Sequence, residues 1–138
     1  MIVLDTNVLS ELMRPAPNGR VLAWMAEQPG DGLFTTAITC GEMLFGARVL
    51  PASRRRDELL AAIGAIFSID MAGRILPYDE AAADAHAWIA TRRRALGRPG
   101  SQSDLMIAGI VRAHGATLAT RNVGDFADCG VDLVDPWQ

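Results

Sequence analysis

The sequence predicts an α/β fold: a three-layer α/β/α domain, in which a mainly parallel central sheet of four to five strands lies between two layers of helices. Short apolar runs alternate with helical segments along the whole chain, and strands separated by helices usually pair in parallel, covered on both faces. Half of the 138 residues are hydrophobic and 21% are charged, which is typical of a folded domain with its own core. No linker, repeat or low-complexity tract interrupts the chain, so we expect a single domain spanning residues 1–138.

Turn and cap residues delimit the expected elements of the first half of the chain. The apolar run "IVL" predicts a strand at 2–4, and an apolar stripe predicts a helix at 8–13 that stops at "RPAP". Asn18 or Gly19 opens a second helix, which ends at the "PG" pair. "GLFTTAI" then predicts a second strand, and "TCGEMLFGARVL" predicts a third helix.

The second half continues the alternation. A longer helical region is expected over about 52–72, followed by the strand "RILPY" and a helix at 79–97 that ends at a C-cap glycine, Gly97. "RPGSQS" is a loop, and the helix "DLMIAGIVRAHG" is closed by Gly115. The runs "ATLAT" and "VDLVDPW" predict the last two strands.

The composition excludes several classes of site. All thirteen basic residues are arginines, which excludes a P-loop lysine, Schiff-base chemistry and the lysine on which receiver domains and haloacid-dehalogenase phosphatases depend. The net charge of −3 argues against a protein that coats nucleic acid. No apolar run approaches the roughly 18 residues that cross a membrane, and the N-terminus does not resemble a signal peptide. Cys40 and Cys129 lack companions at zinc-ligand spacing, so we expect a reducing compartment, the cytoplasm.

Three acidic residues precede apolar stripes in the same way. Asp5, Glu42 and Asp104 are each followed at i+3, i+4 and i+7 by apolar or small residues, which share one helix face. Each acid is therefore expected at the top of a buried face, in or just before the first helical turn. In a parallel sheet covered by helices, the strand carboxyl ends and the helix N-termini that follow them face one crevice, so the three carboxylates are expected to meet there.

Helix capping offers a second explanation for the same acids. Thr39 to Glu42 and Ser101 to Asp104 both match the capping box, and acids are favoured at helix N-termini in any case. Asp79 shows the same pattern and is expected to be an ordinary N-cap. Position alone leaves both explanations open.

A shared crevice would favour a metal site. Three carboxylates without a lysine would repel one another unless a divalent cation were present, and oxygen ligands suit Mg²⁺, with Mn²⁺ able to substitute. The chemistry that matches such a site is metal-assisted phosphoryl hydrolysis.

Five segments together resemble one known family over the whole chain. They are "MIVLDTNVLSEL", "TTAITCGEMLFGA", "RILPYDEAAA", "SDLMIAGIVRAHGATLATRNVGDF" and "VDPW". Their order and spacing resemble a PIN domain of the VapC/FitB type, the ribonuclease toxins of bacterial toxin–antitoxin pairs.

The resemblance implies a set of site residues. The acids that match Asp5, Glu42 and Asp104 hold the metal in that family, and a fourth acid comes from the segment that matches "TRNVGDF". Here Asn122 stands where many relatives have Asp, which leaves Asp125 as the fourth carboxylate and puts binding of a second metal in doubt. Two hydroxyls, those of Thr6 and Thr120, resemble the family's hydroxyls near the metal and water, although a cap and a strand residue explain them equally well.

The resemblance also implies an activity and partners. The implied activity is that of a Mg²⁺-dependent endoribonuclease that leaves a 5′-phosphate and a 3′-hydroxyl on its RNA substrate. The implied partner is a cognate antitoxin protein that inhibits the enzyme, and contact with operator DNA is expected only through that antitoxin. The enzyme itself is expected to be a homodimer. The alternative is a catalytically weak PIN scaffold that acts as a binding module in a DNA-bound repressor complex. Asn122 and the acidic net charge motivate that alternative.

The remaining conspicuous residues have more ordinary explanations. The arginine runs at 54–56 and 92–94 are either RNA contacts or solvated faces. His86 and His114 are expected to pack against other residues or to lie in the last turn of a helix. Cys40 is expected to be a buried packing residue. The three tryptophans are expected in the core or an interface: Trp24, Trp88 and Trp137.

The stretch "NVLSELM", the helix that follows it and region 52–72 have more apolar residues than the sheet of one small domain needs to bury, which predicts an interface. The resemblance implies that this interface is the groove for the antitoxin's C-terminal segment. The apolar residues of this region are Leu59, Leu60, Ile63, Ile66 and Phe67.

Overall fold

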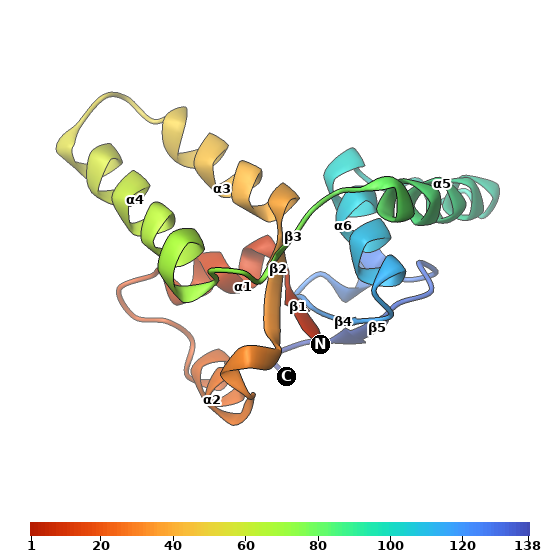
Figure 1. Ribbon diagram of the computed structural model, residues 1–138, viewed down its shortest axis with the longest axis horizontal. Coiled ribbons are helices and arrows are strands. Elements are labelled where there is room, and N and C mark those ends of the chain that lie inside the picture. The colour runs from red at the N-terminus through yellow and green to blue at the C-terminus, as the bar shows by residue number, and fades with distance from the viewer.

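The computed structural model describes all 138 residues and contains one five-stranded sheet (Figure 1). Every neighbouring pair of strands is parallel, and the strand order is β3-β2-β1-β4-β5. The strands are β1 (Ile2–Leu4), β2 (Leu33–Thr36), β3 (Ile75–Leu76), β4 (Thr117–Ala119) and β5 (Asp132–Val134). The predicted fold class is confirmed, with five strands in the sheet.

The helices cover both faces of this sheet (Figure 1). Helices α5 and α6 lie on one side, and α1, α2 and α4 lie on the other (Figure 1). The helices are α1 (Thr6–Leu12), α2 (Gly19–Glu27), α3 (Ala37–Arg48), α4 (Arg54–Ala65), α5 (Glu80–Ala95) and α6 (Gln102–Ala113). Short helical turns lie at Gly30–Gly32, Ile66–Asp70 and Val123–Phe126. None of the helices is long and apolar enough to cross a membrane.

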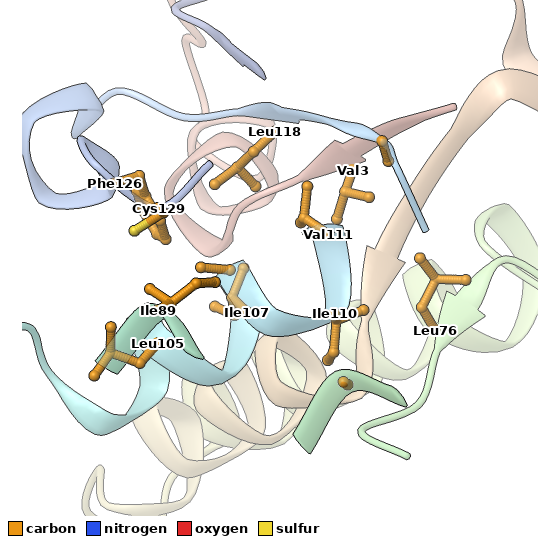
Figure 2. Close-up of a cluster of buried hydrophobic side chains, with 13 residues drawn as sticks. Val3, Leu76, Ile89, Leu105, Ile107, Ile110, Val111, Leu118, Phe126 and Cys129 are labelled. Atoms are coloured by element: carbon orange, nitrogen blue, oxygen red, sulfur yellow. The ribbon is translucent and has the colours of Figure 1, made fainter. Parts of the chain in front are cut away.

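Alternation along the strands divides the core into two clusters. Successive strand side chains point to opposite faces, so Val3 and Leu118 pack with α5 and α6, while Leu4 and Ala119 pack with α1 to α4. Figure 2 shows the first cluster, in which strand residues meet the buried face of α6. That helix buries Ile107, Ala108, Ile110 and Val111 completely. The sheet is therefore held from both sides, and only its edges and strand ends reach solvent.

Several predicted element boundaries are wrong by a few residues, and α3 matters most for the site. The strand β2 ends at Thr36 because the Thr36 side chain accepts a hydrogen bond from Thr39 N and so starts the helix at Ala37. The expected capping box between Thr39 and Glu42 is therefore not formed. Glu42 instead lies in the second turn of α3, beyond the reach of a cap.

The apolar stripe that was expected below Glu42 is also wrong. Phe45 is 69% exposed and Val49 is 61% exposed. The buried face of α3 consists of Thr39, Met43 and Ala47 instead. Glu42 therefore stands at the border between the buried face of its helix and solvent.

The predicted excess of apolar residues over 52–72 is not found on the residues named for it. Ile63 and Phe67 are buried, and Leu59, Leu60 and Ile66 pack against the same core cluster. Regular α-helix ends at Ala65, and Ile66–Asp70 forms a wider π-helical turn. Exposed apolar side chains lie instead at Phe45 of α3, at Val49, the C-cap of that helix, and at Ile69 in the π turn.

Candidate active site

The predicted acids converge on the carboxyl edge of the sheet. Asp5 follows β1 and Thr120 follows β4, and these two strands are neighbours although they are far apart in sequence. The chain proceeds from β1 to β2 on one side and returns to β4 on the other, so the strand order reverses between β1 and β4. Ligand sites of open α/β sheets form at such a reversal.

Asp5 is both the N-cap of α1 and the most buried acid of the site. One carboxylate oxygen, Oδ1, accepts a hydrogen bond from Thr6 N at 2.8 Å, and the other, Oδ2, accepts one from Thr120 Oγ1 at 2.8 Å. Asn7 Nδ2 lies 3.4 Å from Oδ2. Three neighbouring groups thus orient the carboxylate. The residue is buried, with only 4% of its surface exposed.

The electrostatics of Asp5 reflect its burial and its acidic neighbours. Burial raises the pKa of Asp5 from 3.8 to about 6, against the opposing effect of the hydrogen bonds from Thr120 and Thr6. The charges of Asp104 and Glu42 raise this pKa further. Asp5 therefore lies close enough to Asp104 and to Glu42 for their charges to act on it.

Glu42 is oriented by a row of three threonines, of which the sequence analysis assigned only Thr6 to the site. Thr6 Oγ1 donates to Glu42 Oε1 at 2.8 Å and lies 3.1 Å from Thr39 Oγ1, which in turn lies 3.3 Å from Thr36 Oγ1. A hydroxyl has one proton, and the charged carboxylate is the stronger acceptor for the proton of Thr6. Thr39 then donates to Thr6 and Thr36 donates to Thr39, so the three protons point toward Glu42.

Asp104 enters the site from the first turn of α6. Its backbone N–H donates to Ser101 Oγ at 3.2 Å, which makes Ser101 the N-cap, as predicted. Burial raises the pKa of Asp104, the Ser101 hydroxyl lowers it, the charge of Asp125 raises it, and the charge of Arg93 lowers it. Asp125 is exposed on the short turn Val123–Phe126. Asp104 therefore takes part in the capped first turn of α6 and also contributes its carboxylate to the site.

The segment after β4 is tied to β1 through two polar side chains. Thr120 is fully buried, and its Oγ1, besides donating to Asp5, accepts from Asn122 N at 3.1 Å and from Asn7 Nδ2 at 3.3 Å. Asn7 Oδ1 accepts from Arg121 N at 3.3 Å. The predicted Asn122 is exposed and makes no side-chain cap bond. Asn7 was missed by the sequence analysis, although it stands in the same "DTN" stretch as Asp5.

The chemistry of these side chains suits a hard cation, but in the observed arrangement they are too far apart to coordinate one together. Carboxylate and hydroxyl oxygens are the ligands that Mg²⁺ and Mn²⁺ prefer. In the observed arrangement no group of three acidic, histidine or cysteine side chains is close enough to hold a metal ion. Asp5 is fixed by hydrogen bonds, so an ion would have to draw the more exposed carboxylates of Glu42, Asp104 and Asp125 toward it.

An open groove of about 410 Å³ begins at the site and runs between α1, α3 and α4. Thr6 and Glu42 line one part of it. Its apolar lining includes Met13, Met43, Ala47, Leu59 and Ile63. A chain segment lying in this groove would reach the carboxylate of Glu42. The predicted interface stays a prediction, and this groove is the concave surface that would suit it.

The other conspicuous residues mostly have structural roles. Arg54 pairs with Glu58 at 3.4 Å on the surface. Arg93 is buried, so it is neither an RNA contact nor part of a solvated face, the two alternatives given for the run 92–94. His86 Nδ1 lies 2.7 Å from the hydroxyl of Tyr78, and His114 is the C-cap of α6, as predicted.

The tryptophans and cysteines are divided between core and surface. Trp137 is buried, Trp24 packs against the second core cluster and Trp88 is 45% exposed beneath the guanidinium of Arg112. Cys129 is buried, while Cys40 is only half-buried. Neither cysteine forms a disulfide.

Comparisons with known proteins agree with this architecture. A profile of the PIN domain matches residues 2–130. A VapC ribonuclease of Sinorhizobium fredii is 37% identical over 138 residues, covering 100% of this chain and 99% of the relative. Toxin FitB of Neisseria gonorrhoeae is 36% identical, with the same two shares. Among solved structures, a chain of FitAB bound to a DNA fragment is similar with a TM-score of 0.92 and 36% identity, covering 100% of this chain and 96% of that chain.

Proposed function

The chain belongs to the PIN-domain family, and from that membership we propose that it is a Mg²⁺-dependent endoribonuclease, the toxin of a toxin–antitoxin pair. The proposal is supported by full-length relatives named VapC ribonuclease and toxin FitB. The observation that carries it is that Asp5, buried and oriented by hydrogen bonds, lies near the charges of Glu42 and Asp104, while Asp104 lies near that of Asp125. Mn²⁺ is expected to substitute for Mg²⁺.

Each side chain of the site has its own role in the proposed hydrolysis. Mg²⁺, when bound, supplies Lewis acidity that activates water and neutralises charge on the scissile phosphate. Asp5 is the fixed ligand, because its two oxygens are already held by Thr6 and Thr120. Glu42 and Asp104 complete the metal-binding set.

The outer residues of the site set the position of water and of the last carboxylate. Asp125 is the fourth acid, and the exposed amide of Asn122 can orient water beside it. Thr6 and Thr120 act through the carboxylates to which they donate. The products are a 5′-phosphate and a 3′-hydroxyl.

We also expect RNA binding to depend on a cation, because of the carboxylates at this edge. RNA presents phosphates, and an edge that carries four acids repels them unless a divalent cation lies between. Asp5 shows the effect within the protein, since neighbouring acids and burial already disfavour its charged form. We therefore infer that substrate and metal bind together.

The groove between α1, α3 and α4 is the proposed antitoxin site. Its apolar lining suits an antitoxin helix or extended segment, and its beginning at Thr6 and Glu42 allows an antitoxin arginine to pair with the acids. Such a pairing inhibits by excluding both metal and phosphate. We propose contact with operator DNA only through the antitoxin, because the similar FitAB structure is a DNA complex.

We also propose a homodimer that works in the cytoplasm. Exposed Phe45 on α3 and Val49 at its C-cap supply apolar surface for self-association. Both cysteines are free, which suits a reducing compartment.

A catalytically weak scaffold in a DNA-bound repressor complex is the second candidate function. Two points favour it: the resemblance implies an acid at the position of Asn122, and the acids are not grouped closely enough to hold an ion as they stand. Calorimetric titration with Mn²⁺ separates the two candidates. The enzyme should bind Mn²⁺ at a specific site, whereas a scaffold whose acids only cap helices should show no specific binding.

The proposed activity is tested with structured RNAs and a matched pair of substitutions. Asp5→Asn removes the charge of the fixed ligand, whereas Asp79→Asn makes the same change at the N-cap of α5, outside the site. We expect cleavage with Mg²⁺ by wild type and Asp79→Asn, and none with EDTA or with Asp5→Asn. Cleavage that survives both the chelator and Asp5→Asn would overturn the metal mechanism.

A further inference from the structure

Three arginines hold the segment 127–130, which follows the turn carrying Asp125. Arg93 of α5 donates from Nη1 to the carbonyl oxygen of Ala127. Arg98 Nη1 donates to Asp128 Oδ2 at 3.1 Å. Arg112 of α6 donates from Nη1 to the carbonyls of Cys129 and Gly130, at 3.4 and 3.3 Å. Every residue of this segment is thus fixed by a guanidinium.

The backbone of the segment is shaped to fit these arginines. Asp128 has a φ of 62°, a conformation that a non-glycine residue rarely adopts. At Gly130 a Cβ would lie 1.8 Å from Arg112 Nη1, so only glycine allows the guanidinium to approach. The contact of Arg112 is therefore built into the fold of the segment, whereas the Arg98–Asp128 pair lies at the surface.

Arg93 is the unusual member because it is a buried cation without an acidic partner. Only 5% of the residue is exposed, and no carboxylate lies within salt-bridge distance of it. Its Nε is buried without a hydrogen-bond partner. Buried charges are normally paired, because removing a cation from water is costly. A buried arginine without an acidic partner is therefore expected to have a role other than packing.

The surroundings of Arg93 connect the two acids at this end of the site. On one side its Nε lies against Gly100, where an added Cβ would be 3.7 Å away, in the loop that leads into α6 and Asp104. On the other side its Nη1 holds Ala127, two residues after Asp125. Its positive charge also lowers the pKa of Asp104.

We propose that Arg93 is a positioning residue that holds the turn carrying Asp125 beside Asp104, so that the two carboxylates can act on one metal ion. This inference rests on the proposed function, since it concerns the metal that the acids would bind. Arg98 and Arg112 hold the far end of the same segment and limit its movement. A guanidinium suits this role better than an ammonium because it presents several donors in a rigid plane.

The test compares Mn²⁺ binding by wild type, Arg93→Met and Arg94→Met in titration calorimetry. Met keeps much of the length and apolar character of the side chain but donates no hydrogen bond. Arg94 is the exposed neighbour on the same helix and serves as the matched control. We expect Arg93→Met to weaken Mn²⁺ binding about tenfold, the loss that removal of outer groups of a metal site typically causes, and Arg94→Met to leave binding unchanged.

A double-substitution cycle distinguishes positioning from general destabilisation. If Arg93 acts through Asp125, Arg93→Met should weaken Mn²⁺ binding much less in an Asp125→Asn background than in wild type. Equal effects in both backgrounds, or wild-type Mn²⁺ affinity in Arg93→Met, would overturn the inference. If Arg93→Met does not fold, Arg93→Lys replaces it in the cycle, because it keeps the charge while losing the planar fork.

Hydrogen exchange of the metal-free protein gives an answer that does not depend on metal binding. We expect Arg93→Met to speed amide exchange at 123–128 and to leave exchange in the β1–β4 pair unchanged. A wild-type protein that binds no Mn²⁺ would count against the proposed function, and this exchange experiment would then decide the role of Arg93 alone. Unchanged exchange at 123–128 would refute that role.

Discussion

At the residue scale, Asp5 shows that a helix cap and a site residue can be the same side chain. The sequence left capping and site formation as alternatives, but the carboxylate has two oxygens and uses one for each purpose. Thr6 N satisfies the cap, while Thr120 Oγ1 fixes the second oxygen from the neighbouring strand. The hydroxyl of Thr120 could be placed only by the fold, because Thr120 and Asp5 are 115 residues apart in the sequence.

Asp5 is expected to make the metal-free protein less stable as the pH rises. Its folded-state pKa of about 6 lies above the ordinary value of 3.8, so its stabilising contribution is full below pH 3.8 and is lost as the pH rises through about 6. One pKa unit corresponds to ~1.4 kcal/mol, so the loss is about 3 kcal/mol.

Denaturant unfolding at pH 4 to 7.5 in EDTA measures the effect of Asp5. The Asp5→Asn protein should lack this part of the pH dependence and should be at least as stable as wild type at pH 7.5. Matching pH profiles for the two proteins would mean that Asp5 is not strained by its burial.

Thr39 is expected to orient Glu42 through Thr6. Thr39→Val removes the hydroxyl that faces Thr6, and we expect roughly tenfold weaker Mn²⁺ binding. Thr35→Val is the matched control, because Thr35 is equally buried but donates to the carbonyl oxygen of Leu4, away from Glu42. Both variants should lose about 1 kcal/mol of stability. Equal Mn²⁺ affinity in the two variants would show that the threonine row is only structural.

At the element scale, α3 explains why part of the site could not be read from the sequence. Thr36 and Thr39 are both good caps, and choosing Thr39 moved the helix start by three residues and gave Glu42 a capping role that it does not have. The spacing of Phe45 and Val49 below Glu42 then suggested a buried face, whereas both side chains are exposed. Tertiary packing of Met43 and Ala47 determined which face of α3 is buried. The faces below Asp5 and Asp104 were predicted correctly, because their helices have one clear apolar stripe.

Helices α5 and α6 are expected to depend on a glycine where they touch. A Cβ at Gly109 would lie 2.6 Å from the carbonyl oxygen of Ala82, so Gly109→Ala should separate the helices and destabilise the protein by roughly 1–3 kcal/mol. Gly64→Ala is the control, because nothing lies within 4 Å of its Cβ, and it should stabilise α4 by up to about 1 kcal/mol. Thermal unfolding of both variants measures the difference, and a stabilising Gly109→Ala would mean that the helices are less tightly packed.

The groove between α1, α3 and α4 is expected to bind the antitoxin. Gly46 lines the groove and has open space at its Cβ, so Gly46→Leu should fill the groove without disturbing the fold. We expect this variant to lose co-purification with the protein encoded beside it, whereas Gly64→Leu should retain it. A Gly46→Leu protein that still binds its partner normally would place the antitoxin on another surface.

At the scale of the whole molecule, the order of the strands assembles the site. The alternation of strands and helices predicted the parallel sheet, and the parallel sheet predicted that Asp5, Glu42 and Asp104 would share an edge. The sequence could not show that Asp125 is carried on a turn held by arginines from α5, the loop after it and α6, because those contacts join segments up to 34 residues apart. The absence of lysine was used to exclude several classes of site and to argue for a cation, but it did not predict that guanidinium groups bind backbone carbonyls.

The central claim is that the carboxylates at this edge form one metal centre. Anomalous diffraction from crystals soaked in Mn²⁺ tests it most directly, because the signal locates the ion independently of activity. We predict a Mn²⁺ peak bounded by Asp5, Glu42 and Asp104, with Asp125 turned toward it, and no such peak in Asp5→Asn crystals. A wild-type protein that cleaves RNA while its Mn²⁺ lies elsewhere, or is absent from this edge, would contradict the account.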